Sequence, residues 1–119
     1  YFVEDAYVGE HNVELALSVS AEVKHLRIDP AMESCICKVK ELTLNGESIP
    51  FSNKRAVTIN GRMAGNTFVF STTDPNINLH LENMNSKAEN EVVLSLEVNR
   101  MAASICEDLE NELKKKIRF

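Results

Sequence analysis

Apolar and polar residues alternate in short runs along most of this chain, which is the two-residue period of a half-buried β-strand. The run from Val92 to Val98 shows the pattern most clearly, with Leu94 and Leu96 on the same face as its two ends. Strands are predicted at residues 13–19, 23–28, 35–44, 49–51, 56–59, 67–71, 77–81 and 92–98. About eight short strands, with turn signals roughly every 8 to 12 residues, favour an all-β, jelly-roll-like β-sandwich over a βαβ fold.

Asp-Pro and Asn-Gly pairs mark the positions where these strands are expected to end. The Asp-Pro pairs at 29–30 and 74–75 are predicted corners, because the residue before a proline is pushed out of the helical region. The Asn-Gly pairs at 45–46 and 60–61 are predicted turns, since both residue types tolerate positive φ. Residues 82–90 are polar and are predicted to form a loop.

The third predicted strand contains a change of parity. Cys35, Cys37 and Val39 share one face, whereas Leu42 and Leu44 resume the apolar pattern one position out of phase. A slip of a single residue is typical of a β-bulge or a bend in the strand. We therefore expect an irregularity between the two halves of this strand, which keeps both sets of apolar side chains directed inward.

The cysteines indicate buried free thiols rather than a disulfide framework. The chain has three of them, Cys35, Cys37 and Cys106, and an odd number is poor evidence for paired disulfides. Buried thiols suit a reducing compartment. A zinc site needs about four ligands, and the histidines are scattered without ligand spacing at positions 11, 25 and 80. We therefore expect no metal and no other cofactor.

The C-terminal segment changes to a helical pattern. Apolar residues recur every four positions, at Met101, Ile105, Leu109, Leu113 and Ile117. Acidic residues lie early in the segment and lysines late, as the helix dipole favours. The pattern predicts an amphipathic helix of about 17 residues, with its apolar stripe covered by the sandwich, by a second copy or by the rest of a longer chain. The predicted organisation is a sandwich at 1–99 and a helix at 100–119 leading toward a further domain.

The charge balance restricts the partners of the chain. Its net charge is −5. A protein that binds a nucleic acid or an anionic membrane needs clustered lysines or arginines on its surface. No apolar run approaches the roughly 20 residues of a membrane-spanning helix. We therefore expect no nucleic-acid partner and no membrane span. Because the chain begins with Tyr1 rather than methionine, we expect it to be either a processed chain or, as the favoured alternative, a piece cut from a larger protein.

Three stretches, HLRIDPAMESCICKVKELTLNG, TINGRM and FVFSTTDPNINLHL, together resemble one protein family. Their order and spacing are similar to a module of bacterial glycosyltransferases that build cell-surface polysaccharides of the lipopolysaccharide or rhamnan type. In that family a Leu-Arg-x-Asp-Pro strand end is followed by a second strand, an Asn-Gly turn and a Phe-x-Thr-x-Asp-Pro-Asn-Ile corner. The corresponding positions here are Leu26, Arg27, Asp29, Pro30, Val39, Leu42, Leu44, Asn60, Gly61, Phe70, Thr72, Asp74, Pro75, Asn76 and Ile77.

The resemblance implies an accessory β-sandwich attached to the catalytic domain of the same parent chain, in the cytoplasm or peripheral to the inner face of the membrane. The sequence itself has no Gly-rich phosphate loop and no nucleophile elbow. The chain is therefore expected to be a non-catalytic fragment of a glycosyltransferase that binds a glycan acceptor or positions the catalytic domain. The alternative is a purely structural module, which would form homo-oligomers through the C-terminal helix.

The candidate ligand-binding residues are Arg27, Asp29, Asp74, Asn76 and Tyr7. The two aspartates are expected to lie near one another at strand ends, with Arg27 as their counter-charge. Such a patch offers groups that bind sugar hydroxyls, and Tyr7 is the best candidate for stacking on a sugar ring in a chain without tryptophan. The alternative is that the Asp-Pro corners only form turns, because aspartate and asparagine side chains bond to nearby backbone amides.

Overall fold

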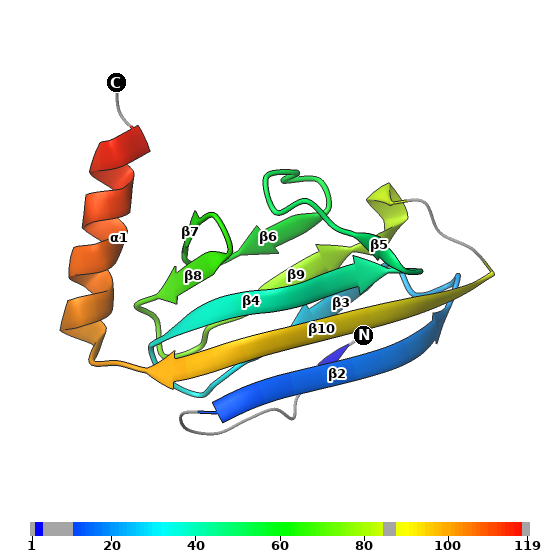
Figure 1. Ribbon diagram of the computed structural model, residues 1–119, viewed down its shortest axis with the longest axis horizontal. Coiled ribbons are helices and arrows are strands. Elements are labelled where there is room, and N and C mark those ends of the chain that lie inside the picture. The colour runs from blue at the N-terminus through cyan, green and yellow to red at the C-terminus, as the bar shows by residue number, and fades with distance from the viewer. Residues whose placement is uncertain (1, 4–10, 85–87, 118–119) are drawn as a thin grey trace.

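The strands form two sheets that pack face to face, and one helix stands at an end of this sandwich (Figure 1). The computed structural model describes residues 2–3, 11–84 and 88–117. The smaller sheet has the order β1 (Phe2–Val3), β3 (His25–Ile28), β9 (Ile77–His80) and β6 (Val57–Ile59). The larger sheet has the order β2 (His11–Ser20), β10 (Glu89–Arg100), β4 (Cys35–Leu44), β8 (Thr67–Phe70) and β7 (Arg62–Ala64), and β5 (Glu47–Ser48) pairs with β4.

The all-β architecture with a C-terminal helix is confirmed. Strand pairs are antiparallel in both sheets, except that the short β1 runs parallel to β3. Most consecutive strands lie in different sheets, so the chain crosses the sandwich repeatedly and uses hairpins only at β4–β5 and β7–β8. A 3-10 helix, η1 (Leu81–Asn83), follows β9, and α1 (Ala103–Ile117) follows β10.

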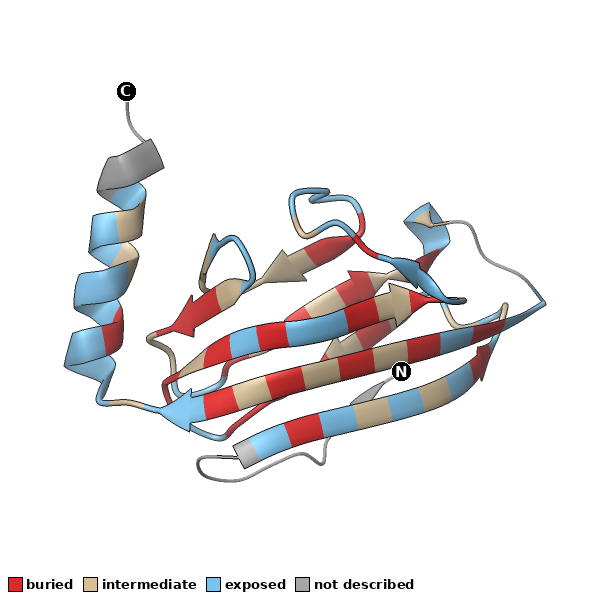
Figure 2. Ribbon diagram, viewed as in Figure 1, coloured by how far each residue is buried: buried red, intermediate tan, exposed pale blue. Residues whose placement is uncertain are grey.

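The core lies between the sheets and is filled by the alternate positions that the apolar pattern predicts. In the smaller sheet, Leu26, Ile28, Ile77 and Leu79 are all at most 1% exposed. In the larger sheet, β10 contributes its apolar residues at 92, 94, 96 and 98, and Figure 2 shows buried and less buried positions alternating along this strand. Burying each such side chain stabilises the fold by about 1.5–3 kcal/mol.

The change of parity in β4 is a β-bulge, as predicted. Val39 pairs with Leu96 and Glu41 pairs with Ser95, so Lys40 is an extra residue without an opposite partner. The bulge allows apolar side chains on both of its sides to remain buried. The strand therefore continues along β10 without turning its second half outward.

The Asn-Gly pair at 45–46 forms the tight turn between β4 and β5. Asn45 has a φ of 53° and Gly46 a φ of 84°, which is the backbone conformation that the pair was expected to supply. The Asn45 side chain also donates to Oδ1 of the buried Asn90 at 3.1 Å and accepts from the Glu91 amide at 2.8 Å. Strand β10 begins at Glu89, where it pairs with Ser20 of β2. The prediction of a loop over 82–90 was therefore wrong at residues 89–90, and also at residues 82–83, which belong to η1.

Several short edge segments differ from the sequence-based expectation. β5 lies at Glu47–Ser48 rather than at 49–51, where Pro50 has no amide hydrogen to donate to a sheet. The sequence pattern does not predict β7, which has only three residues, or the two-residue β1. Short edge strands are too brief for a two-residue period to stand out.

Helix α1 contacts the sandwich through a narrower face than its apolar stripe suggests. Cys106 is fully buried, and the Glu110 carboxylate accepts hydrogen bonds from Ser71 N at 3.0 Å and Ser71 Oγ at 2.9 Å. Ile105 and Leu109 are 45% and 38% exposed. The sandwich therefore leaves these two residues uncovered, and cover by a second copy or by the rest of a longer chain stays a prediction.

The three thiols lie together where α1 meets β4. Cys35, Cys37 and Cys106 are free and buried, as predicted, with 3.8 Å between the sulfur atoms of Cys35 and Cys37. The hydrogen bond with Cys35, together with burial, strongly raises the pKa of the Cys37 thiol. Burial is also the main cause that raises the pKa of Cys106. Because the pKa values of Cys37 and Cys106 are raised, these two thiols stay protonated at neutral pH and are poor nucleophiles.

This burial predicts a loss of stability at alkaline pH. The native state keeps the Cys37 proton, whereas the unfolded chain releases it above pH ~8.5. The free energy of unfolding should therefore fall with rising pH, by up to about 1.4 kcal/mol per pH unit for this thiol. Urea denaturation between pH 8 and pH 10 under reducing conditions measures the slope. The Cys37→Ala variant should show a flatter slope, and an unchanged slope would contradict this account.

Candidate functional site

The two Asp-Pro corners lie side by side at one end of the smaller sheet. Strands β3 and β9 are antiparallel, with Ile28 paired to Ile77, so the end of β3 and the start of β9 share one edge. Asp29 follows β3 directly, and Asp74 lies in the turn that leads into β9. Residues 45 positions apart in the sequence are thus brought together, as the sequence analysis expects.

Arg27 connects the two corners. Its Nε and Nη2 donate to the two carboxylate oxygens of Asp29 at 2.9 and 3.2 Å, and Nη2 also lies 3.4 and 3.5 Å from those of Asp74. The hydrogen bond with Asp29 is the main cause that raises the pKa of Arg27, opposed by desolvation and assisted by the charges of Asp29 and Asp74. The side chains of Asp29 and Asp74 are 19% and 69% exposed, so the second carboxylate faces solvent.

The corner around Asp74 is also held by bonds that define its backbone. Asn60 donates from Nδ2 to the Asp74 carbonyl at 2.8 Å and accepts from the Asn76 amide at 2.9 Å. The Asp74 amide donates to Thr72 Oγ1 at 3.1 Å. Turn formation therefore accounts for the backbone of Asp74 and Asn76, while the Asp74 carboxylate remains directed to Arg27 and to solvent.

A row of polar side chains continues from this corner along β3 and β9. Asn78 Nδ2 donates to Asn76 Oδ1 at 2.9 Å, and His25 Nε2 lies 2.8 Å from Asn78 Oδ1. The His25 and His80 rings stack with their centroids 5.1 Å apart and an angle of 7° between their planes. We call His25, Arg27, Asp29, Asp74, Asn76, Asn78 and His80 the polar face.

The polar face contains four of the five residues that the sequence predicts for a ligand site. Arg27, Asp29, Asp74 and Asn76 belong to it, whereas Tyr7 lies outside the described residues. His25, Asn78 and His80 are additional members. The signal for them is the alternation itself, because they occupy the outward positions of strands whose other residues are buried.

The polar face presents both hydrogen-bond donors and hydrogen-bond acceptors. Its carboxylate and amide oxygens accept hydrogen bonds, and its guanidinium, amide and imidazole nitrogens donate them. The two carboxylates share one guanidinium, to which both are ion-paired. Among the described residues, no group of three or more His, Cys, Asp or Glu side chains could hold a metal ion. No helix among these residues is long and apolar enough to cross a bilayer.

Comparison with known proteins gives no match to a protein-family model, to a curated protein or to a solved structure. The resemblance to a glycosyltransferase module therefore stays a prediction based on the three sequence stretches. The fold and the polar face are inferred from the strand pairing and the hydrogen bonds of the structure.

Proposed function

We propose that this chain is a non-catalytic binding module whose polar face recognises a glycan. The observation that supports the proposal is the Arg27–Asp29–Asp74 cluster, which is continuous with a row of amide and imidazole groups on the outer side of the smaller sheet. A sugar hydroxyl both donates and accepts, so it matches a surface where donors and acceptors alternate over short distances. The cluster combines one cation with two carboxylates, and this excess of negative charge disfavours an anionic ligand.

The proposed affinity is low. Sugar rings gain much of their binding energy by stacking on exposed aromatic side chains, and the chain has no tryptophan and only seven other aromatic residues. Two of these, Phe68 and Phe70, are fully buried in the core. A dissociation constant on the order of 1 mM, which corresponds to about −4 kcal/mol, is therefore expected for a short oligosaccharide.

The resemblance of the three sequence stretches supplies the biological setting of the proposal. The module would belong to a cytoplasmic glycosyltransferase of surface-polysaccharide assembly and would present the glycan acceptor to the catalytic domain of the same parent chain. A jelly-roll arrangement is part of the same proposal, and the repeated crossing of the chain between the two sheets supports it.

The test is a calorimetric titration of the chain with bacterial surface oligosaccharides. The double variant Asp29→Asn, Asp74→Asn removes both carboxylates but retains side chains of the same shape, and binding should weaken at least about tenfold. Glu97→Gln is the matched control, because Glu97 pairs with Lys40 at 3.0 Å on the larger sheet. Equal binding by the double variant, or no binding by the natural chain at millimolar glycan, would overturn the proposal.

A structural or oligomerisation module is the second candidate. The observation that favours it is the exposure of Ile105 and Leu109 on α1, which leaves apolar surface available to another copy or domain. This candidate needs no ligand, so a folded chain that binds no glycan would be its expected behaviour.

A further inference from the structure

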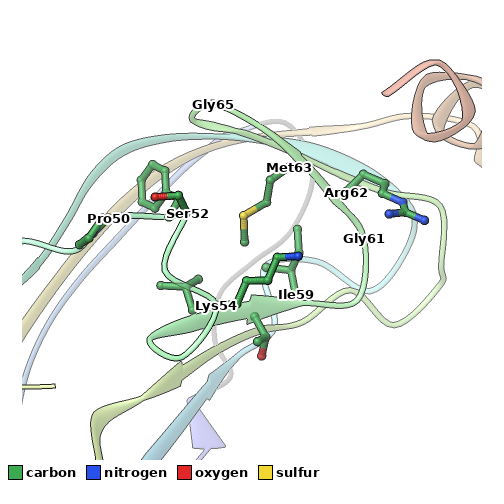
Figure 3. Close-up of a pocket in the computed structure, with 11 residues that line it drawn as sticks. Pro50, Ser52, Lys54, Ile59, Gly61, Arg62, Met63 and Gly65 are labelled. Carbon is green, nitrogen blue, oxygen red and sulfur yellow. The ribbon is translucent and has the colours of Figure 1, made fainter. Parts of the chain in front are cut away.

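A hollow lies where the last strands of the two sheets meet. Strand β6 is one of the two edge strands of the smaller sheet, and β7 is one of the two edge strands of the larger sheet. The loop from Pro50 to Lys54 borders the space between them. The hollow has a volume of about 740 Å³. It is lined by Pro50, Phe51, Ser52, Lys54, Val57, Thr58, Ile59, Gly61, Arg62, Met63 and Gly65 (Figure 3).

The inner surface of the hollow is apolar and is held in place by the core. Phe51 packs edge-on against the buried Phe68, with ring centroids 5.5 Å apart and an angle of 81° between the rings. Ile59 and Met63 are half-buried and pack against the same core. Figure 3 shows the Met63 side chain directed into the hollow. A space of this size with a mainly apolar lining is typical of small-molecule sites, which span about 300–1,000 Å³.

The charge at the hollow is positive, in contrast to the chain as a whole. Lys54 and Arg62 line it, no acidic residue does, and the net charge of the chain is −5. In the part of the chain that the structure describes, neither cation forms an ion pair with a carboxylate. Figure 3 shows Lys54 extending across the hollow toward Ile59, whereas the Arg62 guanidinium points away at the rim. Lys54 is thus the cation best placed to meet a bound anion.

We propose that this hollow binds a small monomeric amphiphile, with its hydrocarbon chain among Phe51, Ile59 and Met63 and its carboxylate or phosphate head at Lys54. Apolar burial supplies affinity, and a charge-assisted hydrogen bond to the ammonium fixes the orientation. The proposal goes beyond glycan binding, because none of the residues of the polar face lines the hollow. Either site can therefore fail its test without affecting the other.

Titration with decyl phosphate below its micelle concentration tests the proposal. Lys54→Gln should weaken binding about tenfold, as expected for the loss of one hydrogen bond to a charged group. Arg62→Gln should have a smaller effect, because its guanidinium points away from the hollow. Lys38→Gln is the matched control, since Lys38 is an exposed lysine of β4 that does not line the hollow. An unchanged affinity in Lys54→Gln would overturn the proposed site.

Further titrations separate the contribution of the ligand's hydrocarbon chain from that of its head group and identify the source of the ligand. Decanoate should bind, whereas decyltrimethylammonium and inorganic phosphate should not, and equal binding of either control would overturn the proposal. Ile59→Trp should fill the hollow and abolish binding, and urea denaturation checks that this variant keeps its fold. If Ile59→Trp unfolds, Ser52→Gln provides a milder obstruction at the rim. Binding to anionic phospholipid vesicles that decyl phosphate does not displace would indicate membrane attachment and would contradict a site for a monomer.

Discussion

Replacing Gly61 with alanine is expected to destabilise the fold by about 3 kcal/mol, the upper part of the range for overpacked sites. A Cβ atom at this position would collide with the backbone carbonyl oxygen of Val69 and lie 2.9 Å from Cδ1 of Phe70. The obstacle is backbone in the adjacent strand β8, so rotation of a side chain cannot relieve it. Gly61 is required because the chain passes from one sheet to the other between β6 and β7, where the two backbones approach closely.

Urea denaturation of Gly61→Ala measures the effect, and Gly65→Ala is the control. Gly65 has a φ of 59° but nothing within 4 Å of an added Cβ, so its substitution should cost only the backbone strain of about 1 kcal/mol. A Gly61→Ala variant that is no less stable than Gly65→Ala would contradict the close approach between Gly61 and β8.

The Phe68→Ala substitution is expected to cost about 3–5 kcal/mol of unfolding free energy, which is the usual range for a buried phenylalanine. Phe68 is fully buried on β8, between the sheets, and contacts Phe51 edge-on. Its removal leaves a cavity in the centre of the core and withdraws support from the loop at the hollow. A loss of this size is a large fraction of the total stability of a small domain, about 5–15 kcal/mol.

The comparison of Phe68→Ala with Phe51→Ala separates burial from the aromatic contact. Both variants remove the same ring pair, but Phe51 is only half-buried, so its replacement should cost distinctly less. Thermal or urea unfolding of the two variants checks the order. Equal losses would show that the contact between the rings, rather than the core position of Phe68, dominates.

The sequence predicts well the strands with long alternating runs, the Asp-Pro corners and the Asn-Gly turn at 45–46. It was wrong about the pair at 60–61, where neither Asn60 nor Gly61 adopts the positive φ expected of such a turn. The alternation at Val92–Val98 identifies β10, which lies between β2 and β4, and the parity slip after Val39 identifies the bulge opposite Ser95. The Asp-Pro corners also end and begin strands as expected, since proline excludes the preceding residue from the helical region. Local chemistry is sufficient for these features, because each depends on neighbouring residues.

Features that depend on contacts between distant residues are not predictable in this way. The stacking of His25 on His80 requires the pairing of β3 with β9, which no local pattern specifies. The hollow arises from two strands of three residues each, β6 and β7, that end different sheets. The direction of α1 follows from the burial of Cys106 and the bond between Glu110 and Ser71, and so its apolar stripe does not show which face meets the sandwich.

The polar face and the hollow give this small module two separate surfaces of opposite character. The polar face carries two carboxylates around one guanidinium, and the hollow carries the cation Lys54 over an apolar lining. Each surface is tested independently by its own variants. The distinction matters because the binding energy would come from hydrogen bonds at one site and from apolar burial at the other.

The most direct test of glycan recognition is a nuclear magnetic resonance titration of the isotope-labelled chain with a bacterial surface oligosaccharide. We expect saturable shifts of the backbone amides at residues 25–29 and 74–80, with little change in the outer strand at 13–19. Their loss in the folded Asp29→Asn, Asp74→Asn variant would place the glycan on the polar face. Shifts confined to residues 50–65, or none at millimolar glycan, would contradict it.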